Sequence, residues 1–490
     1  MSKLETGLHY PLKLDVLPEA WRIGHVGDFA DEIQPGFASG KHNKEGAGIP
    51  HIRPYNIDRQ GKLDLTEIKS VAPESDAKRL RTGDVLFNNT NSPELIGKTT
   101  VIASAEDWGF SNHMTRIRFK DDVAPKFAAY QLHFLWMTGY YLHNCVKHVN
   151  QASISSKTLA NAVPFIAPPF DQQKRIVAEI EKQFSRLDEA VANLKRVKAN
   201  LKRYKAAVLK AAVSGRLVET EAELARREGR SYETGAQLLQ RILETRRGQW
   251  KGKGKYKEPA APDTTDLPKL PEGWTWCGFE QVSVADKHAL KAGPFGSALK
   301  KELYVESGYK IYGQEQVIRG DSKFGDYFID ETKFRELESC AVKPGDLLIS
   351  LVGTAGKVLV LPQNTMPGII NPRLLKLSLN HSHISPEYAA YMLQSSLASH
   401  YFKLQAHGGT MEILNLGIIK ALPVPLPPAA EQQRIVAEVD RRFSFLRQIE
   451  AQVDVNLQRR TVGLQQTILV HAFAGHHLWD GAVSGAHEMR

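Results

Sequence analysis

Two stretches of this chain repeat apolar residues at the seven-residue spacing of a coiled-coil helix. In the first stretch the stripe runs through Ile180, Leu187, Leu194, Leu201 and Val208, and its second seam position is filled by Phe184, Val191, Val197, Tyr204 and Ala211. In the second stretch the apolar positions are Ile435, Val439, Phe443, Leu446, Val453, Leu457, Leu464 and Ile468. Each pattern predicts a helix of about 44 residues, roughly 65 Å long at about 1.5 Å per residue. An isolated helix cannot bury such a stripe, so we expect the two helices to pair as a coiled coil; two separate helices, each packed on its own domain, are the alternative.

The residues that lead into these helices are themselves repeated. PPFDQQKRIVAEI occupies residues 168–180 and PPAAEQQRIVAEV occupies residues 427–439, and the two strings align without a gap. LPEAW at 17–21 returns as LPEGW at 270–274, and GDVLF at 83–87 matches GDLLI at 345–349. The chain is therefore a tandem duplication of one unit. A two-fold axis between the two copies would make the long helices antiparallel.

Between the repeated strings the apolar pattern changes to short strand-like runs with one late helix in each copy, at 125–146 and 385–406. We therefore expect a mixed α/β (α+β) fold with two globular domains. The expected division is 1–170 for the first domain, 171–215 for the first long helix, 216–269 for a connector, 270–429 for the second domain, 430–475 for the second long helix and 476–490 for a tail. In the connector, 223–247 is expected to be helical and the Gly-, Pro- and Lys-rich remainder an extended linker.

The excess positive charge of the chain is concentrated in its middle. Residues 171–258 hold 22 Lys and Arg against 12 Asp and Glu, a net charge of +10 that equals the net charge of the whole chain. Such segregation favours an anionic partner, with nucleic acid as the first candidate; a solvated helical face is the alternative.

The spacing of the cysteines and the hydropathy of the chain indicate the cellular compartment in which the protein works. Cys145, Cys277 and Cys340 lie far apart and form no CxxC pair, which indicates neither a zinc site nor a disulfide framework. No run of roughly 20 apolar residues predicts a membrane span. We expect a protein of the reducing cytoplasm.

Three strings resemble catalytic motifs, and each departs from its motif in what the chemistry needs. APPF at 167–170 has Ala167 where amino-methyltransferases hold the target nitrogen with an asparagine. SPELIGKTT at 92–100 resembles a phosphate-binding loop but has Ser92 in place of the first glycine. Glu74, Asp76 and Lys78 are spaced too tightly to surround one metal ion from adjoining strands. Because HExxH, GxSxG and paired His or Cys ligands are also missing from the sequence, we expect a binding protein with no catalytic residue and no metal site.

Polar and basic residues near the repeated strings suit contacts with DNA. Arg and Lys pair with phosphates or guanine edges, whereas Asn and Gln suit adenine. In the first domain the candidates are Lys41, His42, Arg53, Asn88, Asn89, Asn91, Lys98, Asn112 and Arg116. In the second domain they are Lys300, Lys301, Gln314, Gln316, Arg319, Thr354, Lys357, Asn371 and Arg373. Taken singly, residues of these types are more often solvated surface residues than DNA contacts.

Two divergent domains that each open at LPExW and close at a proline-rich turn into QQxRIVAE and a long helix resemble the specificity (S) subunits of type I restriction-modification enzymes. The resemblance covers nearly the whole chain and extends to Phe184-Ser185 and Phe443-Ser444, although the second copy reads FSFLR and lacks the acidic residue of the FSxLD continuation. It implies two target-recognition domains, each reading one half of an asymmetric bipartite DNA sequence, and a helix pair that sets the gap between the halves.

The resemblance also implies a set of partners. They are double-stranded DNA, two methyltransferase subunits that bind S-adenosylmethionine and methylate adenine, and two restriction subunits that use ATP and Mg. The chain itself is then expected to bind no cofactor and to catalyse no reaction. A stand-alone DNA methyltransferase or nuclease, and a coiled-coil scaffold that binds only protein, are the alternatives.

Overall fold

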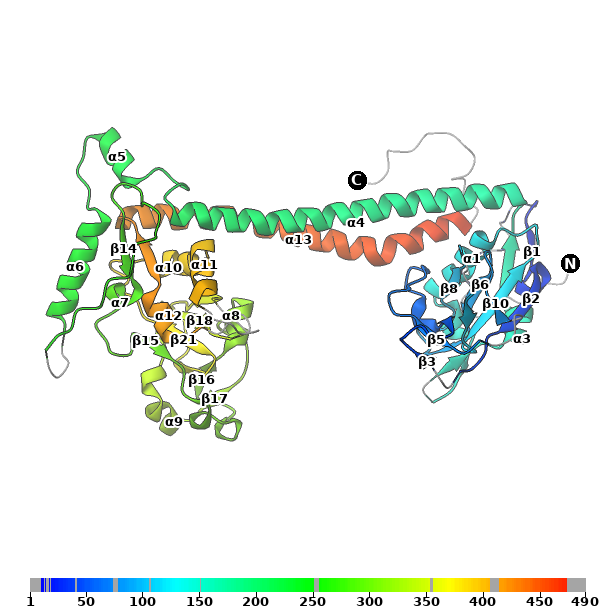
Figure 1. Ribbon diagram of the computed structural model, residues 1–490, viewed down its shortest axis with the longest axis horizontal. Helices are drawn as coiled ribbons and strands as arrows, with labels where there is room; N and C mark the ends of the chain where they lie inside the picture. The colour runs from blue at the N-terminus through cyan, green and yellow to red at the C-terminus, as the bar shows by residue number, and fades with distance from the viewer. Residues whose placement is uncertain are drawn as a thin grey trace. The chain divides into compact units, whose positions relative to one another are not determined.

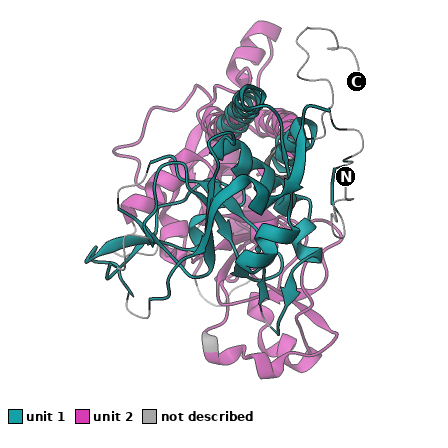
Figure 2. Ribbon diagram, turned by 90° about the vertical axis from the view of Figure 1, so that its right-hand side faces the viewer, with its two compact units in different colours: residues 1–196, 453–490 teal, residues 197–452 magenta. Residues whose placement is uncertain are grey.

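The computed structural model of the protein divides into two compact units. It describes residues 10–12, 14, 17, 19–39, 42–73, 78–104, 107–149, 151–250, 255–352, 356–405 and 414–473. Unit 1 comprises residues 1–196 and 453–490, and unit 2 comprises residues 197–452 (Figure 2). Both long helices therefore contribute to both units, each unit contains one globular lobe, and unit 2 also contains the connector.

Lobe 1 is built from short strands in four small sheets. The main sheet has the order β2 (Ala30–Pro35), β10 (Met114–Phe119), β6 (Val85–Asn88), β8 (Thr99–Val101), and a second sheet has the order β3 (His42–Asn43), β5 (Lys69–Val71), β4 (Ile49–Ile52), β9 (Gly109–Phe110). The remaining sheets pair β1 (Arg22–His25) with β13 (Pro164–Ala167), and β11 (Val146–Lys147) with β12 (Ala152–Ser153) and β7 (Thr90–Asn91). Its helices are η2 (Val26–Phe29), η3 (Pro54–Asn56), α1 (Pro125–Met137), α2 (Tyr140–His143) and α3 (Ser156–Ala162).

Lobe 2 repeats this plan. Its main sheet has the order β15 (Leu290–Ala292), β21 (Leu374–Leu377), β18 (Leu347–Ser350), β19 (Val358–Val360), and a smaller sheet has the order β17 (Phe328–Ile329), β16 (Tyr309–Tyr312), β20 (Gly368–Ile370). β14 (Thr275–Gly278) pairs with β22 (Pro423–Leu426) as β1 pairs with β13. Its helices are α7 (Phe279–Val282), η5 (Gly296–Ala298), η6 (Lys301–Leu303), α8 (Gln314–Arg319), α9 (Glu331–Glu336), η7 (Glu338–Cys340), α10 (Pro386–Leu393), α11 (Ser396–Gln405) and α12 (Leu416–Ala421).

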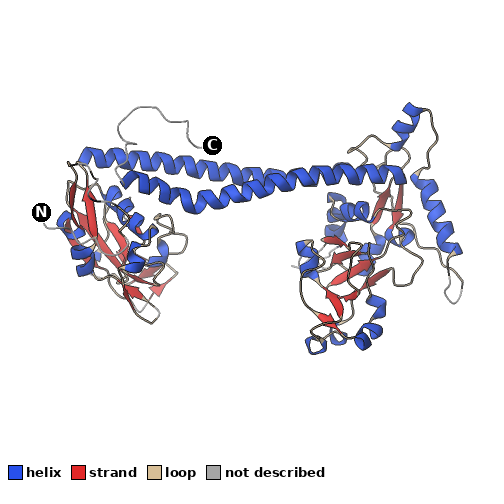
Figure 3. Cartoon of the chain, turned by 180° about the vertical axis from the view of Figure 1, so that it is seen from behind, coloured by secondary structure: helices blue, strands red, loops and turns tan. Residues whose placement is uncertain are grey.

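The two main sheets have the same strand order relative to the sequence, so the internal repeat is confirmed as a structural repeat. Strands are confined to the lobes, as Figure 3 shows, and the fold is mixed α+β as expected. Each predicted late helix is divided in two: in lobe 1 the break lies at Gly139, whose φ of 81° belongs to the left-handed region that glycine adopts without strain.

The long helices are α4 (Phe170–Val213) and α13 (Ala429–Phe473), and they run antiparallel (Figure 1). In unit 1 the start of α4 shares a core with the end of α13, through Ile176 and Ile180 on one side and Phe473 on the other. In unit 2 the end of α4 shares a core with the start of α13, through Val208 and Val439. Within each unit opposite ends of the helices meet, which confirms the antiparallel pairing.

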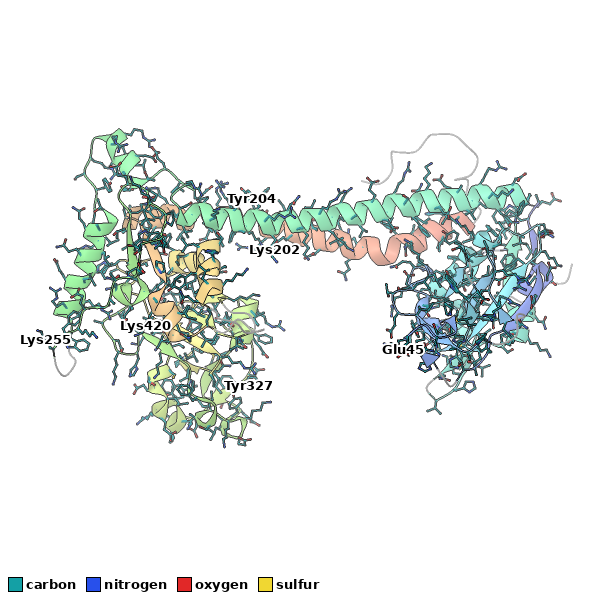
Figure 4. The ribbon with its side chains drawn as sticks, viewed as in Figure 1. Glu45, Lys202, Tyr204, Lys255, Tyr327 and Lys420 are labelled. Carbon is teal, nitrogen blue, oxygen red and sulfur yellow. The ribbon has the colours of Figure 1, made fainter. Side chains whose placement is uncertain are left out.

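The seam between the helices differs from the predicted seam at several positions. Val197 and Tyr204 are 39% and 46% exposed, and Leu464 is 40% exposed (Tyr204 and Lys202 are labelled on α4 in Figure 4). Ile180, Leu187, Leu201, Val208, Val439, Leu446 and Val453 are buried, and Leu194 and Leu457 are half-buried. Where the seam is buried, the two apolar residues of one heptad are four residues apart, as Ile180 and Phe184 are. A side chain only three residues after Leu201, such as Tyr204, is therefore turned out of the seam.

Lys205 takes the seam position that Tyr204 was expected to fill. Its ammonium lies 2.6 Å from a carboxylate oxygen of Glu450 on α13, and both side chains are about 30% exposed. A charged side chain at this position is compatible with helix pairing because its alkyl stem packs along the seam while its ammonium finds an opposite charge.

A buried glutamine explains why the QQ string is repeated. The Gln173 amide oxygen accepts a hydrogen bond from Ala124 N (2.8 Å) just before α1, and its nitrogen donates to the carbonyls of Asp122 (3.0 Å) and Pro168 (2.8 Å). Gln432 makes the equivalent bonds in unit 2, listed in the same order: Ser385 N (2.9 Å), His383 O (3.4 Å) and Pro427 O (3.1 Å). Each glutamine thus joins the first turn of a long helix to the start of a lobe helix.

The connector contains two helices instead of the single predicted one, α5 (Glu221–Glu228) and α6 (Gly235–Gly248). α5 ends at Gly229, whose φ is 65°. Most connector arginines are held in ion pairs of 2.6–2.8 Å, namely Arg226–Glu272, Arg227–Glu219, Arg230–Glu228, Arg241–Glu233 and Arg247–Glu258. Their charge is therefore largely balanced by carboxylates. Among the described helices, none has the length and apolarity needed to cross a membrane.

Candidate nucleic-acid interface

In lobe 2, strand ends from both sheets converge at one edge. Gly293 N, directly after β15, donates to Leu374 O at the start of β21 (2.9 Å). Asn371 N donates to Tyr312 O at the end of β16 (2.8 Å), and Leu351 N, after β18, donates to Arg373 O (3.0 Å). We call the loops that these bonds hold together, residues 293–295, 313–314, 350–352 and 371–373, the loop edge of lobe 2.

Lobe 1 builds the same edge with the same main-chain bonds. Gly36 N donates to Met114 O (3.0 Å), Ser111 N donates to Ile52 O (2.9 Å) and Asn89 N donates to His113 O (3.0 Å). The loop edge of lobe 1 therefore comprises residues 36–37, 52–53, 88–91 and 111–113. Because loops carry binding functions on a scaffold that sheets hold rigid, these two edges are the candidate interfaces.

The loop edges bring together a subset of the predicted DNA-contacting residues. In lobe 1, Asn89 donates from its side chain to Asn112 O (3.2 Å) and to Thr115 Oγ1 (2.9 Å), and the Asn112 side chain is exposed. Asn91 lies on the same loop, half-buried. In lobe 2, Gln314 donates to Ser350 Oγ (2.8 Å).

Asn371 and Arg373 complete the set in lobe 2. The Asn371 carboxamide oxygen accepts a hydrogen bond from Arg373 N (2.9 Å), which shapes the turn and leaves the Arg373 side chain exposed. Lys357, which directly precedes β19, is also exposed. Lobe 1 thus presents carboxamides together with Arg53 and His113 at its edge, and lobe 2 presents the Arg373 guanidinium beside carboxamides.

Besides Asn89, which is also buried, four predicted contacts are buried and already engaged inside their lobes. Asn88 donates to Leu95 O (2.9 Å), and Gln316 donates to Phe324 O (2.7 Å) while accepting from Gly313 N (2.8 Å). The Lys98 ammonium donates to Ile57 O, and burial lowers the pKa of Lys98.

Arg116 is the fourth, and its side chain is fully buried. Its guanidinium donates to Glu32 (2.6 Å), to Gln34 (2.7 Å) and to Arg79 O (2.6 Å), and burial lowers its pKa. Neighbouring Arg118 pairs with Asp84 (2.8 Å) and with Glu32 (2.8 Å). This network joins β10 to β2 and to the segment before β6 that holds Arg79 and Asp84, so Arg116 is a structural residue of the lobe in this structure.

Other predicted residues lie away from these loops or outside the described residues. Lys300 and Lys301 are exposed around η6, and the Arg319 guanidinium lies over the Phe324 ring, 3.9 Å from its centroid, at the end of α8. Lys41 and Thr354 are outside the described residues. Among the described residues, no group of three His, Cys, Asp or Glu side chains is placed to hold a metal ion.

A basic cluster on the small sheet of lobe 1 was only partly predicted. Arg53, half-buried after β4, is the largest influence that lowers the pKa of His42 on β3, and Lys69 on β5 also lowers it. Lys69 lies on β5, which pairs with both β3 and β4, so the two cations and His42 belong to one sheet; Tyr55, two residues after Arg53, is 47% exposed. Lys69 was missed because only the register of β5 against β4, which pairs it with His51, brings it to this cluster.

Comparisons with known proteins agree with this architecture. Residues 295–458 match the family model of the type I restriction modification DNA specificity domain. A putative type I restriction enzyme specificity subunit (MjaX) of Methanocaldococcus jannaschii is 22% identical over 427 residues, which cover 86% of each chain. The EcoKI specificity subunit of Escherichia coli K12 is 24% identical over 487 residues, covering 94% of this chain and 89% of the relative.

Solved structures show the same fold. The crystal structure of the HsdS subunit from Thermoanaerobacter tengcongensis matches with a TM-score of 0.51 at 19% identity, covering 94% of this chain and 98% of that one. A chain from a study of complex assembly and conformational transition in a type I restriction-modification system matches with a TM-score of 0.58 at 18% identity, covering 94% and 99%. The chain therefore contains a match to the type I restriction modification DNA specificity domain, and along nearly its whole length it is similar to specificity subunits of type I restriction enzymes.

Proposed function

We propose that this chain is the DNA-recognition subunit of a type I restriction-modification complex, in which each lobe reads one half of an asymmetric bipartite target. The observation that carries this proposal is the pair of loop edges, because the same main-chain bonds hold different side chains in the two lobes. A repeated frame with unlike side chains suits two readers of two unlike sequences.

The side chains available at each edge favour different base contacts. Asn112 and Asn91 of lobe 1 carry the donor and acceptor pair that matches an adenine edge, whereas Arg373 of lobe 2 can donate two hydrogen bonds to guanine. Lys357 and the cluster of Arg53, His42 and Lys69 then serve as contacts to phosphate. The buried residues Asn88, Lys98, Arg116 and Gln316 are left out of this proposed set.

The paired helices have two roles in the proposal. Their length sets the number of unread base pairs between the half-sites, and exposed α4 lysines without an ion pair among the described residues, such as Lys202 and Lys210, supply positive charge toward an anionic partner. The connector arginines, already paired with carboxylates, contribute less than their number suggests.

The chemistry of the complex then belongs to its partners in the cytoplasm. Two methyltransferase subunits with S-adenosylmethionine methylate adenine, and two restriction subunits with ATP and Mg cut DNA, while this chain catalyses neither step. Because an adenine must leave the base stack to be methylated, the recognition lobes must hold DNA that is locally opened.

Mapping of methylated adenines in DNA from cells that express the chain with its partner subunits tests the proposal. We expect a motif of two unequal specific halves separated by a fixed number of unspecified base pairs. A palindromic or uninterrupted motif would refute the assignment of one lobe to each half.

A further inference from the structure

One aromatic side chain at the loop edge of lobe 2 is almost wholly exposed. Phe295 is 91% exposed, a larger fraction than for any other aromatic residue in the described part of the chain. A single exposed apolar residue is not unusual on a protein surface. The position of Phe295 within the loop edge is what makes its exposure informative.

The backbone that carries Phe295 is fixed on both sides. Gly293 N donates to Leu374 O (2.9 Å), and a Cβ on Gly293 would lie 1.9 Å from Asn371 O, so only glycine allows this approach. On the other side, Ala298 N donates to Phe295 O (2.8 Å) and closes the short η5 turn. The exposed phenyl ring is therefore carried by an anchored loop, whose first residue, Gly293, lies against the backbone of Asn371.

Lobe 1 has no aromatic residue at the position of Phe295, because Gly36 matches Gly293, Phe37 matches Pro294 and Ala38 matches Phe295. Phe37 directly follows Gly36, and it is 6% exposed, with its ring centroid 4.7 Å from that of His51. Its backbone is bonded to Phe110 O and to Asn112 N (3.0 and 3.1 Å). In lobe 1 the phenyl ring next to the glycine is therefore buried, whereas lobe 2 carries an exposed phenyl ring one residue further along the loop.

We propose that Phe295 inserts into the base stack of the half-site that lobe 2 reads. This inference rests on the proposed function, since it requires the loop edge to face DNA. A phenyl ring can stack on a base or wedge apart a base step, and either contact removes the ring from water. Because the loop is already anchored, little conformational freedom is lost when the ring enters the stack.

The test uses the full chain in its complex and a duplex of its mapped target, with 2-aminopurine placed in turn at positions of each half-site. We expect the wild-type protein to raise fluorescence at one step of the second half-site. F295A should remove this rise and weaken binding roughly ten- to hundred-fold, as for the loss of one base–aromatic stack, whereas F295W should keep both. F445A, which removes a phenyl that is 63% exposed on α13, is the matched control and should bind as wild type.

Equal fluorescence and equal affinity for wild type and F295A would overturn the inference. So would an F295A variant that loses affinity for a partner subunit but keeps the fluorescence rise on DNA. Failure of the proposed function itself has a different signature, because the wild-type complex would then show no preference for the bipartite duplex over a scrambled one.

Discussion

Replacement of Gln432 by alanine tests the link between each long helix and its lobe. In the native structure the Gln432 side chain, 1% exposed, satisfies Ser385 N at the start of α10 and the carbonyls of His383 and Pro427. In Q432A these groups remain buried but lose their partner. The variant should therefore loosen α10 and the start of α13 together.

The size of the effect follows from these bonds. An unsatisfied buried donor or acceptor costs about 1–3 kcal/mol, and a carbonyl with its second lone pair free costs less than an amide. Ser385 N is the amide at stake, so we expect Q432A to destabilise unit 2 by about 2–5 kcal/mol when the small cavity is included.

Hydrogen exchange followed peptide by peptide measures this change within each lobe. Q432A should raise exchange in α10 and leave α1 unchanged, and Q173A should do the reverse. Q432E keeps an acceptor for Ser385 N but directs a carboxylate at two carbonyl oxygens, so the pKa of the new carboxyl group should be raised. The variant should therefore lose stability as the pH rises above the pKa of a free Glu. Unchanged exchange in α10 for Q432A, or equal changes in both lobes, would refute the reasoning.

Three further predictions address the interface, the core and the helices. K357A should reduce the slope of the log binding constant against log salt concentration by about 1, because the exposed Lys357 is assigned to a phosphate contact. K98A should leave this slope unchanged and lower the stability of lobe 1, and equal slopes for the wild type and K357A would contradict the assignment. Burial lowers the pKa of His133 to about 4, so the neutral imidazole contributes at most about 3 kcal/mol to the free energy of unfolding above about pH 6.5, and this contribution is lost as the pH falls toward 4. In urea titrations H133Q should lose less stability than the wild type over that pH range, and an identical loss would show that His133 is not the cause. Insertion of one heptad into each long helix, between Leu194 and Leu201 and between Leu446 and Val453, adds roughly 10 Å of helix, or about three base pairs of spacer, and mapped methylation should show both half-sites unchanged; an unaltered gap would show that the helices do not set it.

The architecture could be read from the sequence because it rests on local, repeated signals. The heptad stripe and the duplicated strings specify two helices and two lobes, and their pairing follows from the need to bury the stripe. The seam residues were predicted less accurately, because Tyr204 and Lys205 are adjacent in the sequence and hydrophobicity alone favours the aromatic residue. The packing of α4 on α13 and the Glu450 carboxylate decide in favour of Lys205.

The candidate site was harder to predict because burial of polar residues depends on tertiary neighbours. Arg116 and Asn112 both resemble DNA contacts in sequence, yet Arg116 lies inside a sheet with Glu32 and Gln34, whereas Asn112 lies in an exposed turn. Residues far apart in the chain supply those partners. Phe295 shows the opposite case, since an apolar aromatic side chain is 91% exposed although its hydrophobicity favours burial.

Exchange of residues 22–160 for the corresponding lobe of another specificity subunit tests the central claim most directly. The measurement is the methylated motif produced by the hybrid complex in cells. If each lobe is an independent reader, one half-site should change to that of the donor, while the other half-site and the gap remain as in the wild type. A hybrid in which both half-sites change together would contradict the account.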